Sequence, residues 1–122
     1  MATDKERELA WAAGFFEGEG SCIIHWKGAL QVAVYQNGNT WPLNRLQATF
    51  GGGIHEYARK GVRKTGGPFK PQGQWTVYGP TAAVFLQAIL PELSPRRQEQ
   101  VQSCLDRWSG LKQWQQAKNG KE

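Results

Sequence analysis

Two runs of alternating apolar and polar residues, 21–27 and 29–36, are separated by a single glycine, Gly28. Alternation with a period of two is typical of a half-buried strand, and a short glycine-containing turn between two such runs is typical of a β-hairpin. The apolar side of this hairpin consists of Cys22, Ile24, Trp26, Leu30, Val32 and Val34. Because the other side is mostly polar, we expect an antiparallel sheet with one covered face and one open face.

The rest of the chain has the pattern of a second hairpin and four helices. The second hairpin is predicted from the runs 54–60 and 74–78, which are joined by a loop rich in glycine, proline and lysine. Proline positions, capping residues and apolar spacing predict helices at 6–17, 41–50, 79–90 and 95–117.

The predicted order of elements, α-β-β-α-β-β-α-α, indicates an α+β fold. The apolar faces are buried together if one four-stranded antiparallel sheet carries the helices on one face. We place a single domain at residues 1–117 and expect a disordered tail at 118–122. The open face of the sheet is expected to collect Ser21, His25, Lys27, Gln31 and Tyr35 and, depending on the register of the second hairpin, either His55, Tyr57 and Arg59 or their neighbours.

Positive charge is concentrated in the middle of the chain. The segment 20–91 contains seven Lys or Arg residues and one acid, Glu56, so it carries a net charge of +6, whereas the flanking parts together carry −1. A basic middle of this kind indicates a surface that binds a polyanion, although a basic protein without such a partner would have the same composition. Arg63, Lys64 and Lys70 fall in the predicted loop, where flexible basic side chains suit phosphates.

Other features of the chain bear on its compartment. The longest apolar run, 9–16, is far shorter than the ~20 residues that span a bilayer, and the first residues show no signal peptide. Cys22 and Cys104 have neither CxxC spacing nor a histidine cluster, so we interpret them as free thiols of a reducing compartment. We therefore expect an intracellular protein that has no membrane partner.

The stretch WAAGFFEGEG, residues 11–20, ends a predicted helix with two carboxylates, Glu17 and Glu19, that alternate with glycines. A carboxylate near a helix C-terminus faces the negative end of the helix dipole, which costs about 0.3–1 kcal/mol. Either both glutamates point into water or a positive group lies beside one of them. On the same helix, small residues recur every fourth position at Ala10, Gly14 and Gly18. They would let another backbone approach closely, unless Gly14 only weakens the helix.

These residues resemble the signature of the LAGLIDADG homing endonucleases. The stretch AGFFEGEGS at 13–21 has the glycine and the alternating acids of that motif in the expected places. Three further stretches resemble the family in the same order: VYQ at 34–36, FGGGI at 50–54 and PELSPR at 91–96. The resemblance covers nearly the whole chain. It implies the family's fold, in which the motif helix packs against a second copy of itself and the last acid of the motif points toward DNA.

The resemblance implies an enzyme that makes metal-dependent double-strand breaks at a long, specific DNA site, as in intron homing. Since the chain has one motif, it also implies a homodimer, and we expect the interface at Ala10, Ala13, Gly14, Glu17 and Gly18. Glu19 corresponds to the metal-binding acid of the family, with the Gly18 carbonyl as a further candidate ligand. Mg²⁺ is the implied cofactor; Mn²⁺ is expected to substitute, and Ca²⁺ is expected to support binding without cleavage.

The remaining site residues follow from the same resemblance. Gln36 matches the residue that orients solvent around the attacking water, and Arg96 falls where the family usually has a lysine. Arginine keeps the charge of lysine but cannot transfer a proton, because its pKa is above about 12. Glu17 matches the first acid of the motif, which we interpret as a helix-end group rather than a ligand. Contacts with double-stranded DNA are expected from the open sheet face and the loop, at Ser21, His25, Lys27, Gln31, Tyr35, Arg59, Arg63, Lys64, Lys70 and Arg97.

Two other functions stay open at this point. A cleavage-deficient relative on the same scaffold would act as an RNA-splicing maturase or as a DNA-binding regulator. A glycosidase would use Glu17 and Glu19 as a carboxylate pair ~5–9.5 Å apart on either side of a sugar. The basic charge of the chain disfavours the glycosidase, and we expect no small-molecule substrate.

Overall fold

The computed structural model describes residues 3–25, 28–38, 40–57, 66 and 72–119, with the backbone alone at 57 and 112–119. The order of helices and strands is α-β-β-α-β-β-α-α, as predicted, and a short 3₁₀ turn, η1, precedes the last helix. The elements are α1 (Asp4–Glu19), β1 (Gly20–Ile24), β2 (Leu30–Asn37), α2 (Trp41–Phe50), β3 (Gly53–Tyr57), β4 (Gln72–Tyr78), α3 (Gly79–Ile89), η1 (Leu90–Glu92) and α4 (Pro95–Asn119).

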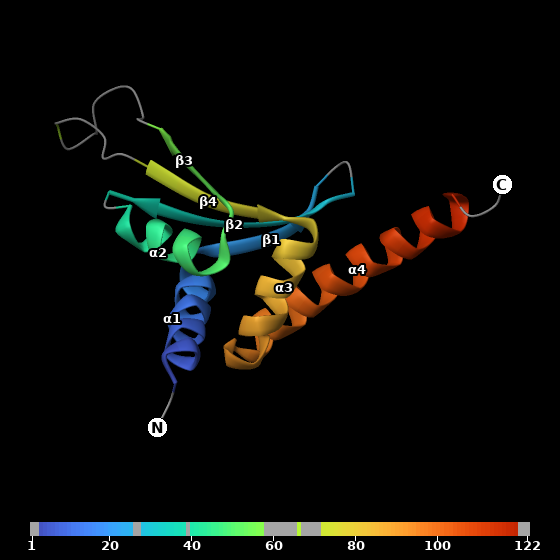
Figure 1. Cartoon of the computed structure of the whole chain (residues 1–122), viewed down its shortest axis with the longest axis horizontal. Coiled ribbons are helices and arrows are strands. Elements are labelled where there is room, and N and C mark those ends of the chain that lie inside the picture. Colours follow the sequence, from blue (N-terminus) through green and yellow to red (C-terminus); the bar gives the residue numbers. More distant parts are fainter. Residues whose placement is uncertain (1–2, 26–27, 39, 58–65, 67–71, 120–122) are drawn as a thin grey trace.

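The strands form one antiparallel sheet in the order β1-β2-β4-β3, and the helices lie on one face of it (Figure 1). The predicted α+β fold is therefore confirmed. The pairing also settles the register of the second hairpin. Ile54 of β3 lies opposite Trp75, which is fully buried, so Ile54 is on the helix side. His55, the next residue, is opposite Gln74 and lies on the open face.

The core lies between the sheet and the helices, and aromatic rings fill its centre. Phe85 of α3 makes edge-to-face contacts with Phe16, Phe50 and Trp75, at centroid distances of 6.1, 4.8 and 5.1 Å. The indole N–H of Trp75 donates a hydrogen bond of 2.8 Å to the carbonyl of Gly51, so this buried polar group is satisfied. Strand β2 contributes Leu30, Val32 and Val34 to the same core.

Helix α1 begins and ends further out than the sequence pattern indicated. The hydroxyl of Thr3 accepts a hydrogen bond of 3.1 Å from the Glu6 N–H, which caps the first turn. At its other end the helix continues through Glu19 and stops at Gly20. Helix α4 runs to Asn119, past the expected end at residue 117, and residues 120–122 lie outside the described part of the chain.

The interface role predicted for Ala13 is wrong, because Ala13 is only 1% exposed and lies in the core of its own chain. Helix α1 buries Ala12, Ala13 and Phe16 against the sheet and α3. The small residues of the other face, Ala10, Gly14 and Gly18, are exposed. Among the described residues, no helix combines the length and apolar character that crossing a bilayer requires.

The cysteine thiols are both free. Cys104 of α4 donates a hydrogen bond of 3.3 Å to the carbonyl of Cys22 in β1. Burial raises the pKa of the Cys22 thiol to about 12, with a further contribution from the neighbouring Cys104. Cys22 therefore behaves as a core side chain rather than as a nucleophile at neutral pH.

An ion pair between Glu8 and Arg45 joins α1 to α2. The guanidinium donates two hydrogen bonds to the carboxylate, at 2.7 and 2.9 Å, and lies 4.0 Å above the ring of Trp11. The hydrogen bond from Arg45 is the main cause that lowers the pKa of Glu8 below its ordinary value of 4.5. A carboxyl whose pKa is lower in the folded than in the unfolded chain stabilises the fold above its ordinary pKa, and this stabilisation disappears as the pH falls through the lowered value.

Replacement of Glu8 by glutamine is therefore expected to lower the Tm at pH 7 by about 5 °C, since a charge-assisted, two-pronged hydrogen bond is lost. The difference in Tm between wild type and Glu8→Gln should shrink as the pH is lowered from 7 to 3. Thermal unfolding at the two pH values measures it. The control is Arg7→Gln, which removes only an exposed pair with Asp4 at 3.7 Å and should change the Tm little. A Glu8 effect of equal size at both pH values would contradict this account.

Candidate nucleic-acid interface and metal position

The open face of the sheet presents hydrogen-bonding side chains from all four strands. Tyr35 of β2, Gln74 of β4 and His55 of β3 lie side by side in one row, because Gln74 is the pairing partner of both others. A second row brings Gln31 beside Tyr78. Alternation places the following residues on this face: Ser21, Ile23, Gln31, Ala33, Tyr35, Asn37, His55, Gln72, Gln74, Thr76 and Tyr78.

Of the residues expected to contact DNA, Ser21, Gln31 and Tyr35 do lie on this open face, and Tyr35 is 44% exposed. His25 lies in the turn after β1, where its backbone N–H donates to the carbonyl of Ala29 at 2.7 Å. The expected basic contacts lie outside the described residues: Lys27, Arg59, Arg63, Lys64 and Lys70. The described part of the face is thus made of amides, hydroxyls and one histidine, which suit base edges more than phosphates.

Sequence reasoning missed the contribution of β4 to this face. Gln72, Gln74, Thr76 and Tyr78 alternate with the buried Gly73, Trp75 and Val77. The period of two was therefore visible in the sequence. Its polar positions could have been assigned to the open face from the apolar ones between them.

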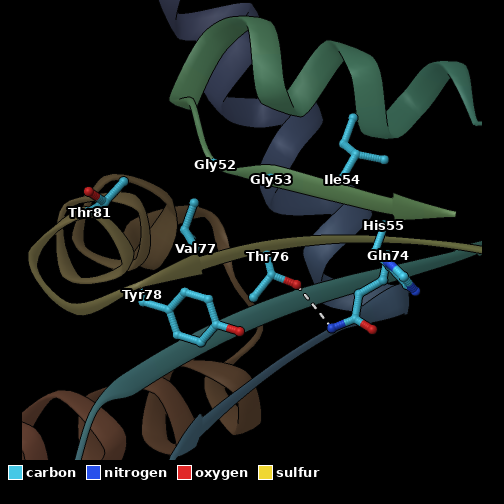
Figure 2. Close-up of a pocket in the computed structure, with 9 residues that line it drawn as sticks. All are labelled: Gly52, Gly53, Ile54, His55, Gln74, Thr76, Val77, Tyr78 and Thr81. Atoms are coloured by element: carbon cyan, nitrogen blue, oxygen red, sulfur yellow. Dashed lines mark hydrogen bonds between the residues drawn. The ribbon is translucent and has the colours of Figure 1, made fainter.

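An open cavity of about 540 Å³ lies over β4 and the edge strand β3, at the end of the sheet where α3 begins. Figure 2 shows Gln74, Thr76 and Tyr78 on one side of β4, with Ile54 and Val77 on the other. The amide of Gln74 donates a hydrogen bond of 2.9 Å to the Thr76 hydroxyl. Gly52 lines the cavity with φ +92°, and a Cβ atom there would lie 2.8 Å from the carbonyl oxygen of Thr76. Glycine is needed at this position, and it keeps the cavity free of a side chain.

Glu19 is the last residue of α1, and its side chain is exposed. Within the described part of the chain, its carboxylate has no hydrogen bond or ion pair. The pairing of Gly20 with Val34 puts Gln36 two residues beyond the point where β1 joins α1, so Gln36 is near this helix end. The Gln36 amide makes one hydrogen bond of 3.5 Å, to the carbonyl of Asn37.

Glu17 has a different environment from Glu19. One carboxylate oxygen accepts a hydrogen bond of 2.6 Å from the Ser94 N–H, and the other accepts one of 3.0 Å from the Ser94 hydroxyl. The backbone hydrogen bond from Ser94 is the main cause that lowers the pKa of Glu17. The helix-end role predicted for Glu17 is confirmed. Its carboxylate is turned onto its own chain rather than toward a partner, and it cannot pair with Glu19 as the second free acid of a glycosidase.

Arg96 and Arg97, at the start of α4, differ in the same way. Arg96 is exposed, whereas the side chain of Arg97 is 13% exposed and its guanidinium lies on backbone carbonyls at the end of α1. The assignment of Arg97 as a DNA contact is therefore corrected: its hydrogen-bonding groups are engaged inside the chain.

A metal ion fits the residues at the end of α1 only as a shared ligand. In the part of the chain that the structure describes, no three His, Cys, Asp or Glu side chains lie close enough to hold an ion together. An exposed carboxylate beside an exposed glycine backbone offers hard oxygen donors, which Mg²⁺ prefers, but an octahedral shell needs further ligands. Glu19 and the Gly18 carbonyl could therefore hold Mg²⁺ in combination with water, phosphate or a second chain.

No family model matches this chain, and no curated protein matches it significantly.

Proposed function

We propose that this protein is a dimeric, magnesium-dependent homing endonuclease that hydrolyses phosphodiester bonds in both strands of a long DNA site. One observation carries the proposal. Of the two acids that end α1, Glu17 is held by Ser94 of its own chain, and Glu19 is exposed without a partner among the described residues. An acid that remains free at the negative end of a helix favours a cation as its partner.

The chemistry assigned to the chain follows from these positions. Mg²⁺ at Glu19 and the Gly18 carbonyl would stabilise charge on the attacking and leaving oxygens of the phosphodiester. Gln36, near the same helix end, is proposed to orient the attacking water through its amide. Arg96 is exposed at the start of α4 and is proposed to neutralise the phosphate without transferring a proton.

The exposed stripe on α1 supports the dimer in this proposal. A Cβ atom built at Gly14 or Gly18 meets no atom within 4 Å, so the chain itself leaves both positions open. A second α1 packed there would bring two copies of Glu19 toward one axis. Two carboxylates near each other repel, so metal binding would stabilise the assembled site.

A second candidate is a cleavage-deficient relative that acts as an RNA-splicing maturase or a DNA-binding regulator. Arg96 favours it, because arginine stands where the family that this chain resembles usually has a lysine able to transfer a proton. The open sheet face would serve either function.

Selection of cleaved sites from a random double-stranded DNA library in Mg²⁺ tests the proposal. We expect one long site to be enriched among the cut molecules, and its two halves should be related by approximate two-fold symmetry. Enrichment of bound but uncut molecules would favour the regulator. A protein that neither cuts nor binds any member of the library would contradict the proposal.

The sheet face should read bases, and the loop should hold the phosphate backbone. We expect Gln31→Ala to reduce discrimination at one symmetric pair of base positions by about 1–3 kcal/mol without a change in salt dependence. The contrasting variant is Lys64→Ala. It should weaken binding to all sequences alike and reduce the slope of log K against log[salt] by up to about 1.8 in a dimer. Salt titrations on cognate and scrambled duplexes measure both effects. An equal loss on both duplexes for Gln31→Ala would exclude this face as the reading surface.

A further inference from the structure

The C-terminus of α1 and the N-terminus of α4 cap each other through Glu17, Ser94 and Arg97, which we call the α1–α4 clasp. In one direction, the Glu17 carboxylate accepts from the N–H and the hydroxyl of Ser94. Ser94 is itself the residue before α4, and its hydroxyl oxygen accepts a hydrogen bond of 3.3 Å from the Arg97 N–H. A negative group at this helix start is favoured by the helix dipole.

In the other direction, Arg97 reaches back to the last turn of α1. Its guanidinium donates to the carbonyl of Glu17 at 3.2 and 3.3 Å, to that of Gly20 at 2.9 Å, and to that of Phe16 at 3.5 Å. The last carbonyls of a helix have no partner within the helix, and they form its negative end. Arg97 therefore supplies both the hydrogen bonds and the positive charge that this helix end lacks.

These contacts bracket Glu19 along the backbone. Arg97 binds the carbonyl of Glu17 on one side of Glu19 and the carbonyl of Gly20 on the other, and the Gly18 carbonyl is not among the oxygens it contacts. Gly20 packs directly against the ring of Phe16, where a Cβ atom would overlap the ring, and the guanidinium carbon lies 5.2 Å from the ring centroid. The peptide that carries Glu19 thus has little freedom to move.

We infer that Arg97 and Glu17 are positioning residues, and that the α1–α4 clasp fixes the direction in which Glu19 projects from the end of α1. The catalytic part of this inference rests on the proposed function, because it gives the Glu19 carboxylate its task. The clasp leaves the Glu19 carboxylate and the Gly18 carbonyl available while it engages the neighbouring backbone oxygens. A fixed carboxylate matters because a displacement of about 1 Å in a reacting group can reduce a rate about 100-fold.

The test compares Arg97→Gln with Arg107→Gln, which removes the same charge from an exposed position on the same helix. We expect amide hydrogen exchange at Glu19 and Gly20 to become at least about 10-fold faster in Arg97→Gln and to stay unchanged in Arg107→Gln. On the selected DNA site, kcat should fall about 100-fold in Arg97→Gln, while KM changes less than about threefold. Arg97→Lys should recover part of the rate, because an ammonium group reaches one carbonyl but cannot fork between two.

The exchange measurement needs neither DNA nor metal, so it separates the two claims. A wild-type protein that cuts no DNA would overturn the proposed function, and exchange at Glu19 would still decide whether the clasp fixes its backbone. Unchanged exchange in Arg97→Gln, or faster exchange with an unchanged kcat, would overturn the positioning role. If Arg97→Gln does not fold, Ser94→Ala removes one hydrogen bond to Glu17 and should raise exchange at Glu19 about threefold. No rise in that variant would overturn the inference.

Discussion

Replacement of Glu19 by glutamine is expected to abolish DNA cleavage, with a loss of at least about 1,000-fold in kcat, and to leave DNA affinity in Ca²⁺ within a few-fold of wild type. Glutamine keeps the size of the side chain but removes the negative charge that a divalent cation needs. Loss of several kcal/mol of stabilisation at the phosphodiester corresponds to this reduction in rate. Because Glu19 is exposed and makes no contact with other described residues, the fold should be unaffected.

The matched control is Glu99→Gln, the same chemical change at an exposed position of α4. It should cut like wild type. Cleavage rates in Mg²⁺ and binding isotherms in Ca²⁺ on the selected site give both quantities. A Glu19→Gln protein that cuts at a rate close to wild type would show that the metal site has been placed on the wrong residue.

Replacement of Gly14 by leucine is expected to weaken dimerisation about 10- to 100-fold and to reduce cleavage in parallel. Overpacking an interface by a large side chain costs about 1–3 kcal/mol, which corresponds to that range of dissociation constants. The isolated chain should tolerate the change, because a Cβ atom at Gly14 meets nothing within 4 Å. The fold of the monomer should even gain up to about 1 kcal/mol from improved helix propensity.

Gly110→Leu is the matched control for this experiment. Gly110 is also an exposed helical glycine with nothing within 4 Å of a built Cβ atom, but it lies on α4. It should gain helix stability without a change in association. Sedimentation equilibrium of the two variants separates the effects. An unchanged dimer in Gly14→Leu would remove the α1 stripe from the interface.

Local patterns were sufficient to predict the sheet. The alternation around Gly28 identified β1 and β2, and the buried positions Leu30, Val32 and Val34 are those that the pattern placed on the apolar side. The register of β3 was left open, because its side chains alternate weakly on both faces. Only the position of Ile54 opposite the buried Trp75 decides it, and that pairing joins segments separated by a loop.

The end of α1 could not be predicted from its own residues. The sequence pattern ended the helix at residue 17, because carboxylates and glycines are poor residues for a last turn. The helix continues to Glu19, and Arg97, about 80 residues away in the chain, binds the carbonyls of its last turn. A local pattern carries no information about such a partner.

The individual roles within the candidate site show the same limit. Ala13 is next to Gly14 in sequence, but one faces the core and the other the outside, and this depends on where the sheet lies against the helix. Arg96 and Arg97 likewise point to different surroundings from one helix start. The sequence identified the residues that matter at the end of α1, and packing between α1 and α4 decided which of them are structural.

The central claim is that two copies of one chain, each with one Glu19, cut both strands of DNA with a divalent metal. Strand-resolved mapping of the cuts in a duplex that carries the selected site tests it most directly. In Mg²⁺ we expect one cut in each strand, at positions related by the two-fold axis of the site, and no cut in Ca²⁺ or in excess EDTA. A break in one strand only, or cleavage that persists in EDTA, would contradict the account.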